Sequence, residues 1–497
     1  MGPQSGTKVS SSEVGKNAMK APPGSIDSEF TGLASDSREV KPGYLFAALP
    51  GAKANGAAFV ADAVARGAIA VLGRPDVEPA VRALGARFIA DDNPRLALAR
   101  QAARFFGAQP KVVAAITGTK GKSSIVAFVR EIWTALGKQA ASLGTVGVVT
   151  PIGEIALKHT TPDPIEIHRL LARLKREGID HLALEASSHG LDQYRLDGVD
   201  IAACAFTNLS RDHFDYHGTV ENYVRAKLRL FSEVVHDGGL AVVNADADYA
   251  DRFVAAAKAR GLKVMTVGDT GDGIHLLSRQ GRIDGQTLTL RFAGKEFKVS
   301  LPLAGSFQAA NALVAAALVI GLGDDPAKVF AALEHLKGAP GRLEKVAVSK
   351  HGAPIFVDYA HTDRSLAEVL QAVRPHVTGK LHVVFGCGGD RDKGKRPLMG
   401  KAATDNADIV IVTDDNPRTE DAAAIRKEAL TGAPGAREIG DRATAIREAV
   451  AALETGDMLI IAGKGHESGQ IVGTEIRPFS DKDEAIKAAI HSGGRAA

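Results

Sequence analysis

The sequence predicts an α/β protein built from three domains. The chain has 497 residues, and domains of about 150 residues each suggest about three of them. Short apolar runs alternate with stretches of helical periodicity, which is the pattern of a mostly parallel sheet covered by helices. Proline or glycine interrupts this pattern near residues 108–111 and 338–341. We therefore expect domains at 26–109, 110–339 and 340–497, after a leader at 1–25.

The leader is rich in Ser, Gly, Pro and Lys and has no apolar core. These features are typical of a flexible tail rather than a secretory signal. In the first domain, continuous apolar runs predict buried strands and helical spacing predicts helices. The expected strands are Tyr44–Leu49 and Ala68–Leu72, and the expected helices are Ala58–Arg66 and Arg95–Phe106.

The second domain begins with an apolar run at Val112–Ile116, a glycine-rich turn and a stretch of helical spacing from Ile125 to Leu136. More strands are expected after it, with an antiparallel excursion over Gly268–Val299. A helix that begins near Gln308 is expected to end before Gly321. The predicted strands are Leu182–Leu184, Ile201–Phe206, Leu240–Val243 and, within the excursion, Thr287–Phe292.

Three further apolar runs, separated by helical stretches, follow the second boundary. They predict a separate doubly wound, Rossmann-like domain. Its expected strands are Leu381–Phe385, Ile409–Thr413 and Met458–Ala462.

The overall composition argues against several classes of protein. The 61 basic and 58 acidic residues nearly cancel, to a net charge of +3, so nothing points to a nucleic-acid or membrane-surface partner. Two cysteines, Cys204 and Cys387, cannot form a disulfide framework, which favours a reducing compartment. The longest apolar run, Ala312–Leu322, is shorter than the about 20 residues that span a bilayer. We therefore expect a cytoplasmic protein without membrane insertion.

The turn after Val112–Ile116 has the composition of a phosphate-binding loop. Its glycines allow a tight turn, its backbone N–H groups and the following helix N-terminus attract anions, and Lys122 adds a cation. A strict P-loop would have glycine at position 116, where this chain has Ile116. An ordinary strand-to-helix turn is the alternative, but the flanking strand and helix favour nucleotide binding on a P-loop ATPase-like parallel sheet. The candidate residues are Gly118, Thr119, Lys120, Gly121, Lys122, Ser123 and Ser124.

Acidic and imidazole side chains follow two neighbouring strands. Glu185 ends the run at Leu182–Leu184, where ligands bind in open α/β sheets. Two His and two Asp lie within 211–218, after Ile201–Phe206. Because no further soft ligand lies nearby, a hard cation or phosphate fits better than zinc. A solvated Glu185 and a merely polar loop are the alternatives.

Together these motifs resemble the Mur ligase family, whose members are ATP-dependent enzymes of peptidoglycan synthesis. The resemblance extends over about 30–485 in matching order and implies the three-domain Mur ligase architecture. It rests on Gly118–Ser123, Glu185–His189, Asp212–His217, Asp36–Arg38, Gly51–Gly56, Gly386–Pro397 and Gly463–Glu467.

The resemblance implies the branch that adds the third residue to UDP-N-acetylmuramoyl-L-alanyl-D-glutamate through an acyl phosphate. Asp415–Arg418 is similar to the motif of the members that add meso-diaminopimelate. A guanidinium can grip the second carboxylate of diaminopimelate with two hydrogen bonds, whereas it would repel lysine. From spacing alone, Asn416-Pro417 could be a simple turn. The implied diaminopimelate residues are Arg391, Asp415, Asn416, Pro417, Arg418, Gly463 and Glu467.

The remaining roles also come from the resemblance. Mg²⁺ would be held by Ser123, Glu185 and His213, with Lys122, His213 and Lys227 in catalytic roles. Further ATP contacts would come from Asn311, Arg342 and Asp358. The UDP-muramoyl dipeptide would be bound by Ser37, Thr160, Thr161, Ser187, Gln193 and Arg195.

At three positions the sequence itself does not fully agree with what the resemblance implies. Lys227 aligns with the carbamylated lysine of the family (N6-carboxylysine), although its pattern alone predicts an exposed lysine on an amphipathic helix. Carbamylation requires a neutral amine and thus a partly desolvated site. Lys120 and His159 stand where relatives often carry Asn, which leaves the geometry at both positions open.

Two alternatives compete with this interpretation. A folylpolyglutamate synthetase would share the central domain but not Asp36–Arg38 or Asp415–Arg418. A P-loop switch that only hydrolyses ATP would not need the groups between Leu381 and Glu467. We expect a monomer whose third domain closes on the second, because the ATP contacts are divided between them.

Overall fold

The computed structural model describes residues 29–51, 55–210 and 212–497. The predicted leader at 1–25 lies outside the described residues, as do Ala52, Lys53, Ala54 and Arg211 of the motifs named above. Contacts divide the chain into two compact units. The first unit comprises the described residues up to Gln109, together with Asp163–Arg173 and Gln193–Val199, and the second comprises the rest. The three predicted domain boundaries remain a prediction.

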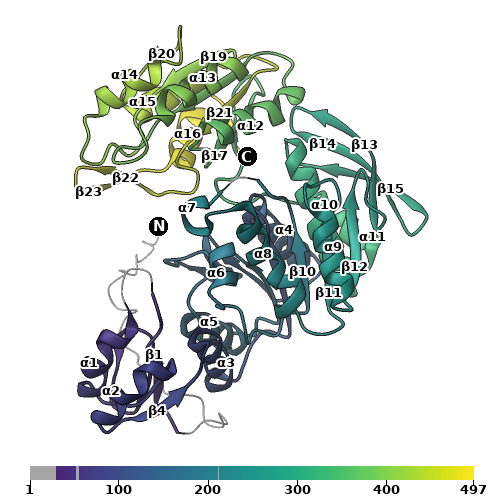
Figure 1. The fold of residues 1–497 in the computed structure, drawn as a ribbon. Helices are drawn as coiled ribbons and strands as arrows, with labels where there is room; N and C mark the ends of the chain where they lie inside the picture. Colours follow the sequence, from purple (N-terminus) through teal and green to yellow (C-terminus); the bar gives the residue numbers. More distant parts are fainter. Residues whose placement is uncertain (1–28, 52–54, 211) are drawn as a thin grey trace, which may run out of the picture. The chain divides into compact units, whose positions relative to one another are not determined.

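The first unit contains a four-stranded parallel sheet in the order β1-β2-β3-β4 (Figure 1). Its predicted strands are present with small changes of boundary, and the helix expected from Ala58 begins as a 3-10 turn at Gly56–Phe59. Apolar side chains such as Leu45, Leu72 and Leu98 pack into its core. The elements are β1 Gly32–Ala34, β2 Tyr44–Ala47, α1 Val60–Ala65, β3 Ala68–Gly73, α2 Glu78–Ala83, β4 Arg87–Ala90, α3 Pro94–Phe106 and most of α5 Pro164–Arg176.

The second unit begins with an eleven-stranded sheet in the order β15-β14-β13-β12-β11-β10-β5-β9-β6-β7-β8. Within this order, the strands from β13 to β6 run parallel to one another. The predicted antiparallel excursion is present as β13–β15. The antiparallel β7 and β8 were not predicted. The strands are β5 Val112–Thr117, β6 Ala140–Gly144, β7 Gly147–Thr150, β8 Gly153–Ile155, β9 His181–Glu185, β10 Ala203–Phe206, β11 Leu240–Asn244, β12 Lys263–Gly268, β13 Ile274–Arg282, β14 Gly285–Phe292 and β15 Lys295–Leu301.

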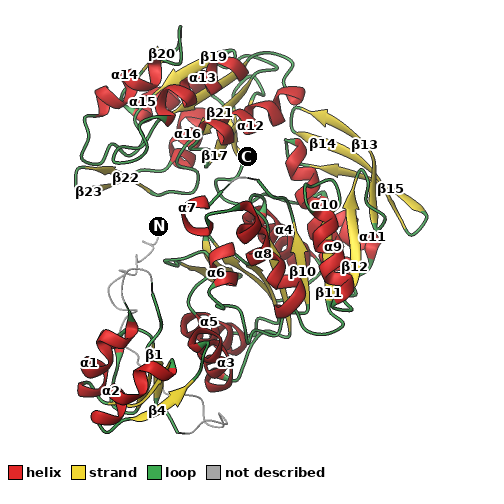
Figure 2. Ribbon diagram, viewed as in Figure 1, coloured by secondary structure: helices red, strands yellow, loops and turns green. Residues whose placement is uncertain are grey.

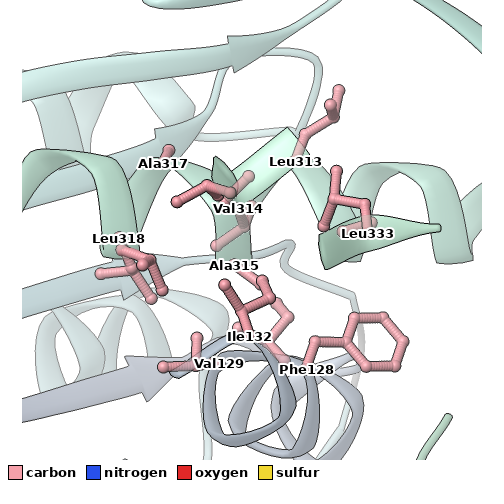
Figure 3. Close-up of a cluster of buried hydrophobic side chains, with 14 of the residues drawn as sticks. Phe128, Val129, Ile132, Leu313, Val314, Ala315, Ala317, Leu318 and Leu333 are labelled. Carbon is pink, nitrogen blue, oxygen red and sulfur yellow. The ribbon is translucent and has the colours of Figure 1, made fainter. Parts of the chain in front are cut away.

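Helices α4 (Lys122–Ala135) and α10 (Ser306–Gly321) pack against each other in the core of this sheet (Figure 3). Nearly every side chain of α10 is buried, as expected for a helix that is apolar on all faces. It includes Gly321, one residue beyond its predicted end. The other helices beside this sheet are α6 Ser188–Asp192, α7 Phe214–His217, α8 Val220–Arg229, α9 Ala250–Ala259 and α11 Pro326–Leu333.

The C-terminal part of the second unit has a seven-stranded sheet in the order β20-β19-β18-β21-β17-β16-β24. Apolar clusters lie on both of its faces, one including Leu366 and Met399 and the other Ile446 and Ala485. This is the predicted doubly wound arrangement, and helices such as α12, α13, α15 and α16 accompany the sheet (Figure 2). At one side of the sheet, β16 pairs antiparallel with both β17 and β24. Its elements are β16 Glu344–Val348, β17 Pro354–Asp358, α12 Asp363–Val373, β18 Leu381–Phe385, α13 Lys395–Asn406, β19 Ile409–Val412, α14 Ala422–Leu430, β20 Arg437–Glu438, α15 Arg442–Ala451, β21 Met458–Ala462, α16 Asp481–His491 and β24 Arg495–Ala496, with a hairpin of β22 Gly469–Val472 and β23 Glu475–Pro478.

His376 joins the two sheets of the second unit. Its Nδ1 donates to the carbonyls of Arg282 and Gly285 at 2.8 and 3.0 Å, and its Nε2 accepts from the backbone N–H of Gly305 at 3.1 Å. One nitrogen donates and the other accepts, so the contact requires the neutral imidazole. Among the helices of the described residues, none has the length and apolarity needed to cross a bilayer.

Candidate active site

The glycine-rich turn between β5 and α4 is shaped by close backbone approaches. Gly118 has φ 147°, and a Cβ added there would lie 1.9 Å from Oγ1 of Thr207. Gly121 has φ 85°, and a Cβ there would lie 2.4 Å from Oδ1 of Asn311. Larger residues would therefore clash at both positions. The same packing brings Asn311 beside the turn, as its predicted role requires.

Two residues that follow β10 form hydrogen bonds with the backbone of the turn. Thr119 N donates to the carbonyl of Asn208 at 2.8 Å, and Lys120 N donates to Asn208 Oδ1 at 3.0 Å. Thr207 Oγ1 donates to the carbonyl of Lys120 at 2.6 Å. Neither Thr207 nor Asn208 was predicted as a site residue, although both directly follow the predicted strand at Ile201–Phe206.

Lys122 points back into the turn. Its Nζ donates to the carbonyls of Gly118 and Thr119, both at 2.9 Å. Burial lowers the pKa of Lys122, while the carboxylates of Glu185 and Asp212 act in the opposite direction. An ammonium enclosed by the turn is suited to neutralise phosphate oxygens bound there.

Glu185 is 1% exposed, so the alternative of a solvated strand-end glutamate is wrong. Its Oε1 accepts from Ser123 Oγ at 2.8 Å and from Thr145 N at 2.9 Å. Thr145 was not predicted, since it lies on a turn between two strands that carry no sequence motif. The resulting group of oxygen atoms matches the ligand preference of a hard cation.

The contacts of His213 do not include the oxygen atoms of Ser123 or Glu185. It precedes α7 with φ 53°, is exposed, and approaches Asp212 and the ring of His189. Within the described residues, no group of three or more His, Cys, Asp and Glu side chains is arranged to hold a metal ion. The structure thus brings together two of the three predicted Mg²⁺ residues, Ser123 and Glu185.

Lys227 on α8 is 1% exposed, so the interpretation as an exposed lysine is wrong. Helical spacing identified an amphipathic helix, but Lys227 lies on the face that packs under the phosphate loop. Its Nζ donates to the carbonyl of Gly118 at 2.7 Å and lies 4.5 Å from the centre of the Tyr223 ring. Burial, and secondarily the charge of Lys122, hold the pKa of Lys227 well below its ordinary value.

Arg342 lies on the connection from α11 into the C-terminal sheet, and Asp358 ends β17 of that sheet. Asp358 is buried, and its two carboxylate oxygens accept from the backbone N–H groups of Leu343 and Ala360 at 2.7 and 2.8 Å. Burial raises the pKa of Asp358, and Arg342 acts against this shift. Nε of Arg342 is buried without a hydrogen-bond partner among the described residues, with its guanidinium 4.9 Å from the ring of Tyr359. An unpartnered guanidinium donor is consistent with the predicted contact to ATP.

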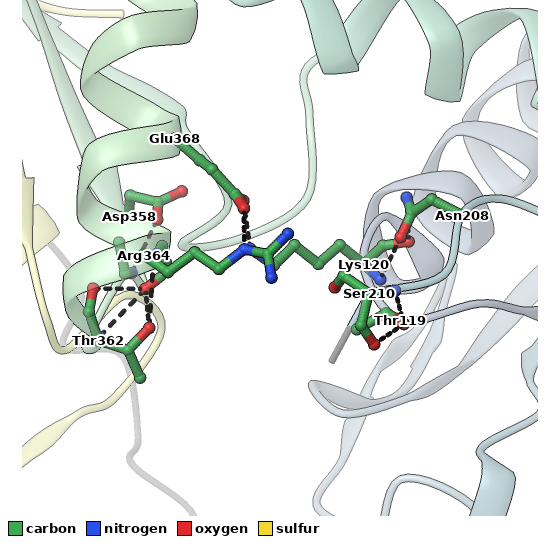
Figure 4. Close-up of polar contacts among 10 residues, drawn as sticks. Thr119, Lys120, Asn208, Ser210, Asp358, Thr362, Arg364 and Glu368 are labelled. Carbon is green, nitrogen blue, oxygen red and sulfur yellow. Dashed lines mark hydrogen bonds and ion pairs between the residues drawn. The ribbon is translucent and has the colours of Figure 1, made fainter. Parts of the chain in front are cut away.

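Lys120 reaches from the phosphate loop to the C-terminal part of the unit. Its ammonium forms an ion pair with Glu368 on α12, and Arg364 Nε donates to the other oxygen of Glu368 at 2.9 Å (Figure 4). Lys120 thus uses its backbone to contact Asn208 and its side chain to contact another domain. This contact was not predicted, because Glu368 carries no sequence motif.

The predicted diaminopimelate residues lie after parallel strands of the C-terminal sheet. Asp415 and Asn416 follow β19 and are buried, and Gly463 and Glu467 follow β21. Asn416 Nδ2 donates to Glu467 Oε2 at 3.0 Å. The carboxyl ends of β19 and β21 therefore bring these residues together, where ligands bind in open α/β sheets.

Arg418 and Arg391 lie on two adjoining loops. Arg418 has φ 52°, and its Nη1 donates to the carbonyl of Gly389 at 2.8 Å. Arg391 is exposed, and Pro417 lies between the buried Asn416 and Arg418. Glu420 ties the loops together by accepting from Asp390 N at 2.6 Å and from the fully buried Arg396 at 2.9 Å. Glu420 and Arg396 were not predicted as site residues.

The predicted UDP-substrate residues are divided between the two units. In the first unit, a cavity of about 170 Å³ contains Gln193 and Arg195, which are joined by a 2.8 Å hydrogen bond. Ser37 in the same unit is buried beside Asp36, whose pKa is held at about 2 chiefly by hydrogen bonds from Arg38. In the second unit, Thr161 Oγ1 donates to the carbonyl of Glu185 and accepts from Ser187 N, and Thr160 contacts Thr145. The cavity is lined by Ser35, Leu49, Arg95, Leu98, Asp163, Pro164, Gln193 and Arg195.

An enclosed lysine in a glycine-rich turn, followed by a doubly wound C-terminal sheet, is the arrangement expected of an ATP-dependent ligase of the Mur type. Three family profiles match the chain in order: "Mur ligase family, catalytic domain" over 29–106, "Mur ligase middle domain" over 116–319 and "Mur ligase, glutamate ligase domain" over 341–465. The chain belongs to the Mur ligase family and has its three-domain α/β fold.

Individual proteins similar to this chain indicate which branch of the family it resembles. A UDP-N-acetylmuramoyl-L-alanyl-D-glutamate--2,6-diaminopimelate ligase of Bradyrhizobium diazoefficiens is 58% identical, over 93% of this chain and 95% of its own length. The protein of the same name in Mesorhizobium japonicum is 53% identical, over 94% and 96%. A solved structure with that name has a TM-score of 0.72 at 35% identity, covering 93% of this chain and 95% of its own. A folylpolyglutamate synthase of Mycobacterium tuberculosis shares the fold at 20% identity and a TM-score of 0.57, over 74% of this chain and 92% of its own.

Proposed function

We propose that this protein joins meso-2,6-diaminopimelate to UDP-N-acetylmuramoyl-L-alanyl-D-glutamate in peptidoglycan synthesis, with ATP as co-substrate. The observation that carries this proposal is the gathering of Asp415, Asn416, Arg418 and Glu467 at one edge of the C-terminal sheet. A guanidinium and a carboxylate on adjoining loops can pair with the carboxylate and the ammonium at the far end of diaminopimelate. Lysine lacks that carboxylate.

The reaction has two steps. The γ-carboxylate of D-glutamate attacks the γ-phosphate of ATP, which gives an acyl phosphate and ADP. The amine of diaminopimelate then attacks the acyl carbon, and phosphate leaves as the amide forms. Several anions meet at one point, so fixed cations and precise positioning supply much of the catalysis.

The phosphate loop supplies the first of these cations. Lys122 neutralises phosphate oxygens from inside the turn formed by Gly118, Thr119, Lys120 and Gly121, with Ser124 in the first turn of α4. The nucleotide site is completed by Asn311 beside Gly121, by Arg342 on the connection to the C-terminal sheet and by Asp358 at the end of β17. In this arrangement the seven-stranded C-terminal sheet must lie close to the eleven-stranded sheet when ATP is bound.

Mg²⁺ is the expected metal. Ser123 and Glu185 offer oxygen atoms 2.8 Å apart at the end of the loop, and oxygen ligands suit this ion. The resemblance adds His213 to this set, although in the structure it lies apart from the two oxygen atoms. When bound, the ion supplies positive charge at the phosphate oxygens.

Lys227 is the proposed site of carbamylation. The amine attacks carbon dioxide only when it is neutral, and the lowered pKa of Lys227 favours that form. Carbon dioxide would bond to the neutral Nζ, which releases one proton and leaves a carbamate anion beside Gly118. The carbamate would attract the ammonium of Lys122 and provide a further oxygen ligand for Mg²⁺.

The dipeptide substrate would use residues of both units: Ser37, Gln193 and Arg195 of the first, and Thr160, Thr161 and Ser187 of the second. Diaminopimelate would contact Arg391, Asp415, Asn416, Pro417, Arg418, Gly463 and Glu467. We further expect a cytoplasmic monomer, which light scattering coupled to gel filtration would check.

The decisive experiment offers the purified protein ATP, Mg²⁺ and UDP-muramoyl dipeptide with either meso-diaminopimelate or lysine. Mass spectrometry of the products should show the diaminopimelate adduct and little lysine adduct, and ADP should form only when both peptide substrates are present. Equal use of lysine would contradict the specificity. ADP formation without an amino acid would instead support an ATP-hydrolysing switch.

A further inference from the structure

Lys464 has no role in the proposed chemistry, yet its side chain is fully buried. It follows β21 and Gly463, in the segment that also carries Glu467. A buried ammonium costs several kcal/mol unless its charge and hydrogen bonds are satisfied. The position of Lys464 therefore depends on the partners that it finds there.

Those partners are two predicted diaminopimelate residues. Lys464 Nζ donates to Asn416 Oδ1 and to Glu467 Oε2, each at 3.0 Å. Asn416 Nδ2 also donates to Glu467 Oε2 at 3.0 Å. The three side chains thus form a closed triangle that joins the loop after β19 to the loop after β21.

The triangle extends to the hairpin β22–β23. Asn416 Oδ1 accepts a second hydrogen bond from Ile471 N at 2.9 Å, so its donors fix which way the amide faces. In the same hairpin, the carbonyl of Ile471 accepts from Arg418 N at 3.0 Å, and Gly473 N donates to the carbonyl of Arg418 at 2.6 Å. Lys464 is therefore connected, through one amide and one hairpin, to the backbone of Arg418.

Glu467 remains available to a ligand in this arrangement. Its side chain is 34% exposed, whereas Lys464 is 0% exposed. The ammonium approaches Glu467 from the protein interior, so the exposed part of the carboxylate faces outward. Lys464 consequently fixes the carboxylate without covering it.

We propose that Lys464 is a positioning residue for diaminopimelate. It fixes the Glu467 carboxylate and, through Asn416 and the hairpin, the backbone from which the Arg418 side chain extends. The far end of diaminopimelate has an ammonium and a carboxylate on one carbon, and a pair of opposite charges distinguishes it from lysine. This inference rests on the proposed function.

The test compares substrate KM values in the variant Lys464→Met, which roughly conserves volume and removes the charge. We expect KM for diaminopimelate to rise about tenfold to a hundredfold, the scale of lost positioning, and its preference over lysine to fall. KM for ATP and for UDP-muramoyl dipeptide should stay within about twofold, as expected for loss of one substrate's contacts.

Two controls separate positioning from stability. Lys482→Met removes an ion pair with Glu344 in the same sheet domain and should change no KM. His382→Phe removes the buried contact of His382 with Asp457, and should lower the melting temperature without a selective change in KM for diaminopimelate. If Lys464→Met shifts all three KM values together, or none, the proposal is overturned.

A second variant keeps the test decisive if Lys464→Met does not fold. Asn416→Asp has nearly the same shape and retains an acceptor for Lys464 and Ile471 N, but it loses the donation to Glu467. KM for diaminopimelate should again rise selectively, and an unchanged value would refute the positioning role. Failure of the unaltered protein to join diaminopimelate would instead refute the proposed function.

Discussion

The side-chain nitrogens of two lysines converge on a single carbonyl oxygen in the phosphate loop. Lys122 and Lys227 both donate to Gly118 O, at 2.9 and 2.7 Å. The charge of Lys122 adds to burial in lowering the pKa of Lys227. An anion at the turn favours the protonated form of both side chains, so the pair is suited to receive phosphate.

Replacing Lys122 with methionine should remove the cation nearest to the bound phosphates. We expect the rate of amide formation to fall by at least about a hundredfold, the usual loss for a group that stabilises developing charge. Product mass and ADP release measure this. Lys138→Met, which removes a partly buried ion pair with Asp324 elsewhere on the same domain, is the control and should remain active. A Lys122→Met protein with normal activity would contradict the assigned role.

The lowered pKa of Lys227 has a consequence for stability. Between its lowered pKa in the folded protein and the ordinary value near 10.5, the unfolded chain binds more protons, so stability rises with pH. Lys227→Met should therefore raise the melting temperature most at the low-pH end of this window, and the gain should shrink toward about pH 10. Calorimetry in carbon dioxide-free buffer measures the difference. A gain that is independent of pH would show that Lys227 is not neutral in the folded protein.

At the scale of elements, the phosphate loop depends on the contact between two strand ends. The turn after β5 rests against Thr207 and Asn208 at the end of the neighbouring strand β10. The sheet thus fixes the loop before any ligand binds, and substitutions that separate the strand ends should act on ATP binding as well as on stability.

Gly118→Ala tests this dependence against a matched glycine. Gly118 and Gly153 have φ of 147° and 148°, but only at Gly118 would an added Cβ meet another residue, Thr207. Both variants carry backbone strain of order 1–3 kcal/mol. We expect Gly118→Ala to lower the melting temperature further and to raise KM for ATP severalfold, while Gly153→Ala leaves KM unchanged. Equal effects in the two variants would mean that the contact with Thr207 is unimportant.

Sequence patterns correctly predicted those parts of the site that are formed by a continuous stretch of the chain. The succession of β5, glycine turn and α4 could be predicted because apolar runs, glycines and helical spacing act over a few residues. The partners that complete the site could not, since Thr145, Glu368 and Lys464 become relevant only through contacts across the fold. For Lys227 the helix was predicted correctly but its buried face was not, because spacing alone does not show which neighbour covers a helix.

At the scale of the second unit, two contacts of different kinds join the nucleotide-binding sheet to the C-terminal sheet. His376 is buried and bonds to backbone groups of β13 and β14 and of Gly305, which precedes α10. Lys120 and Glu368 form an exposed ion pair, with side chains 43% and 40% exposed. A buried network is costly to break, whereas an exposed pair contributes about 0.2–1 kcal/mol. We therefore infer that His376 is the pivot and that the pair of Lys120 and Glu368 opens and closes.

A double-mutant cycle tests this assignment. Lys120→Gln, Glu368→Gln and the double variant should show a coupling of about 0.2–1 kcal/mol in kcat/KM for ATP, which becomes smaller at high salt because ions screen exposed pairs. The cycle of Arg364→Gln with Glu368→Gln is the control, because that pair lies within α12 and its coupling energy should appear in stability but not in kcat/KM for ATP. Small-angle scattering with ATP and both peptide substrates should show compaction that is weaker in Lys120→Gln. Additive effects in the first cycle, together with a scattering profile that the substrates leave unchanged, would rule out closure through this pair.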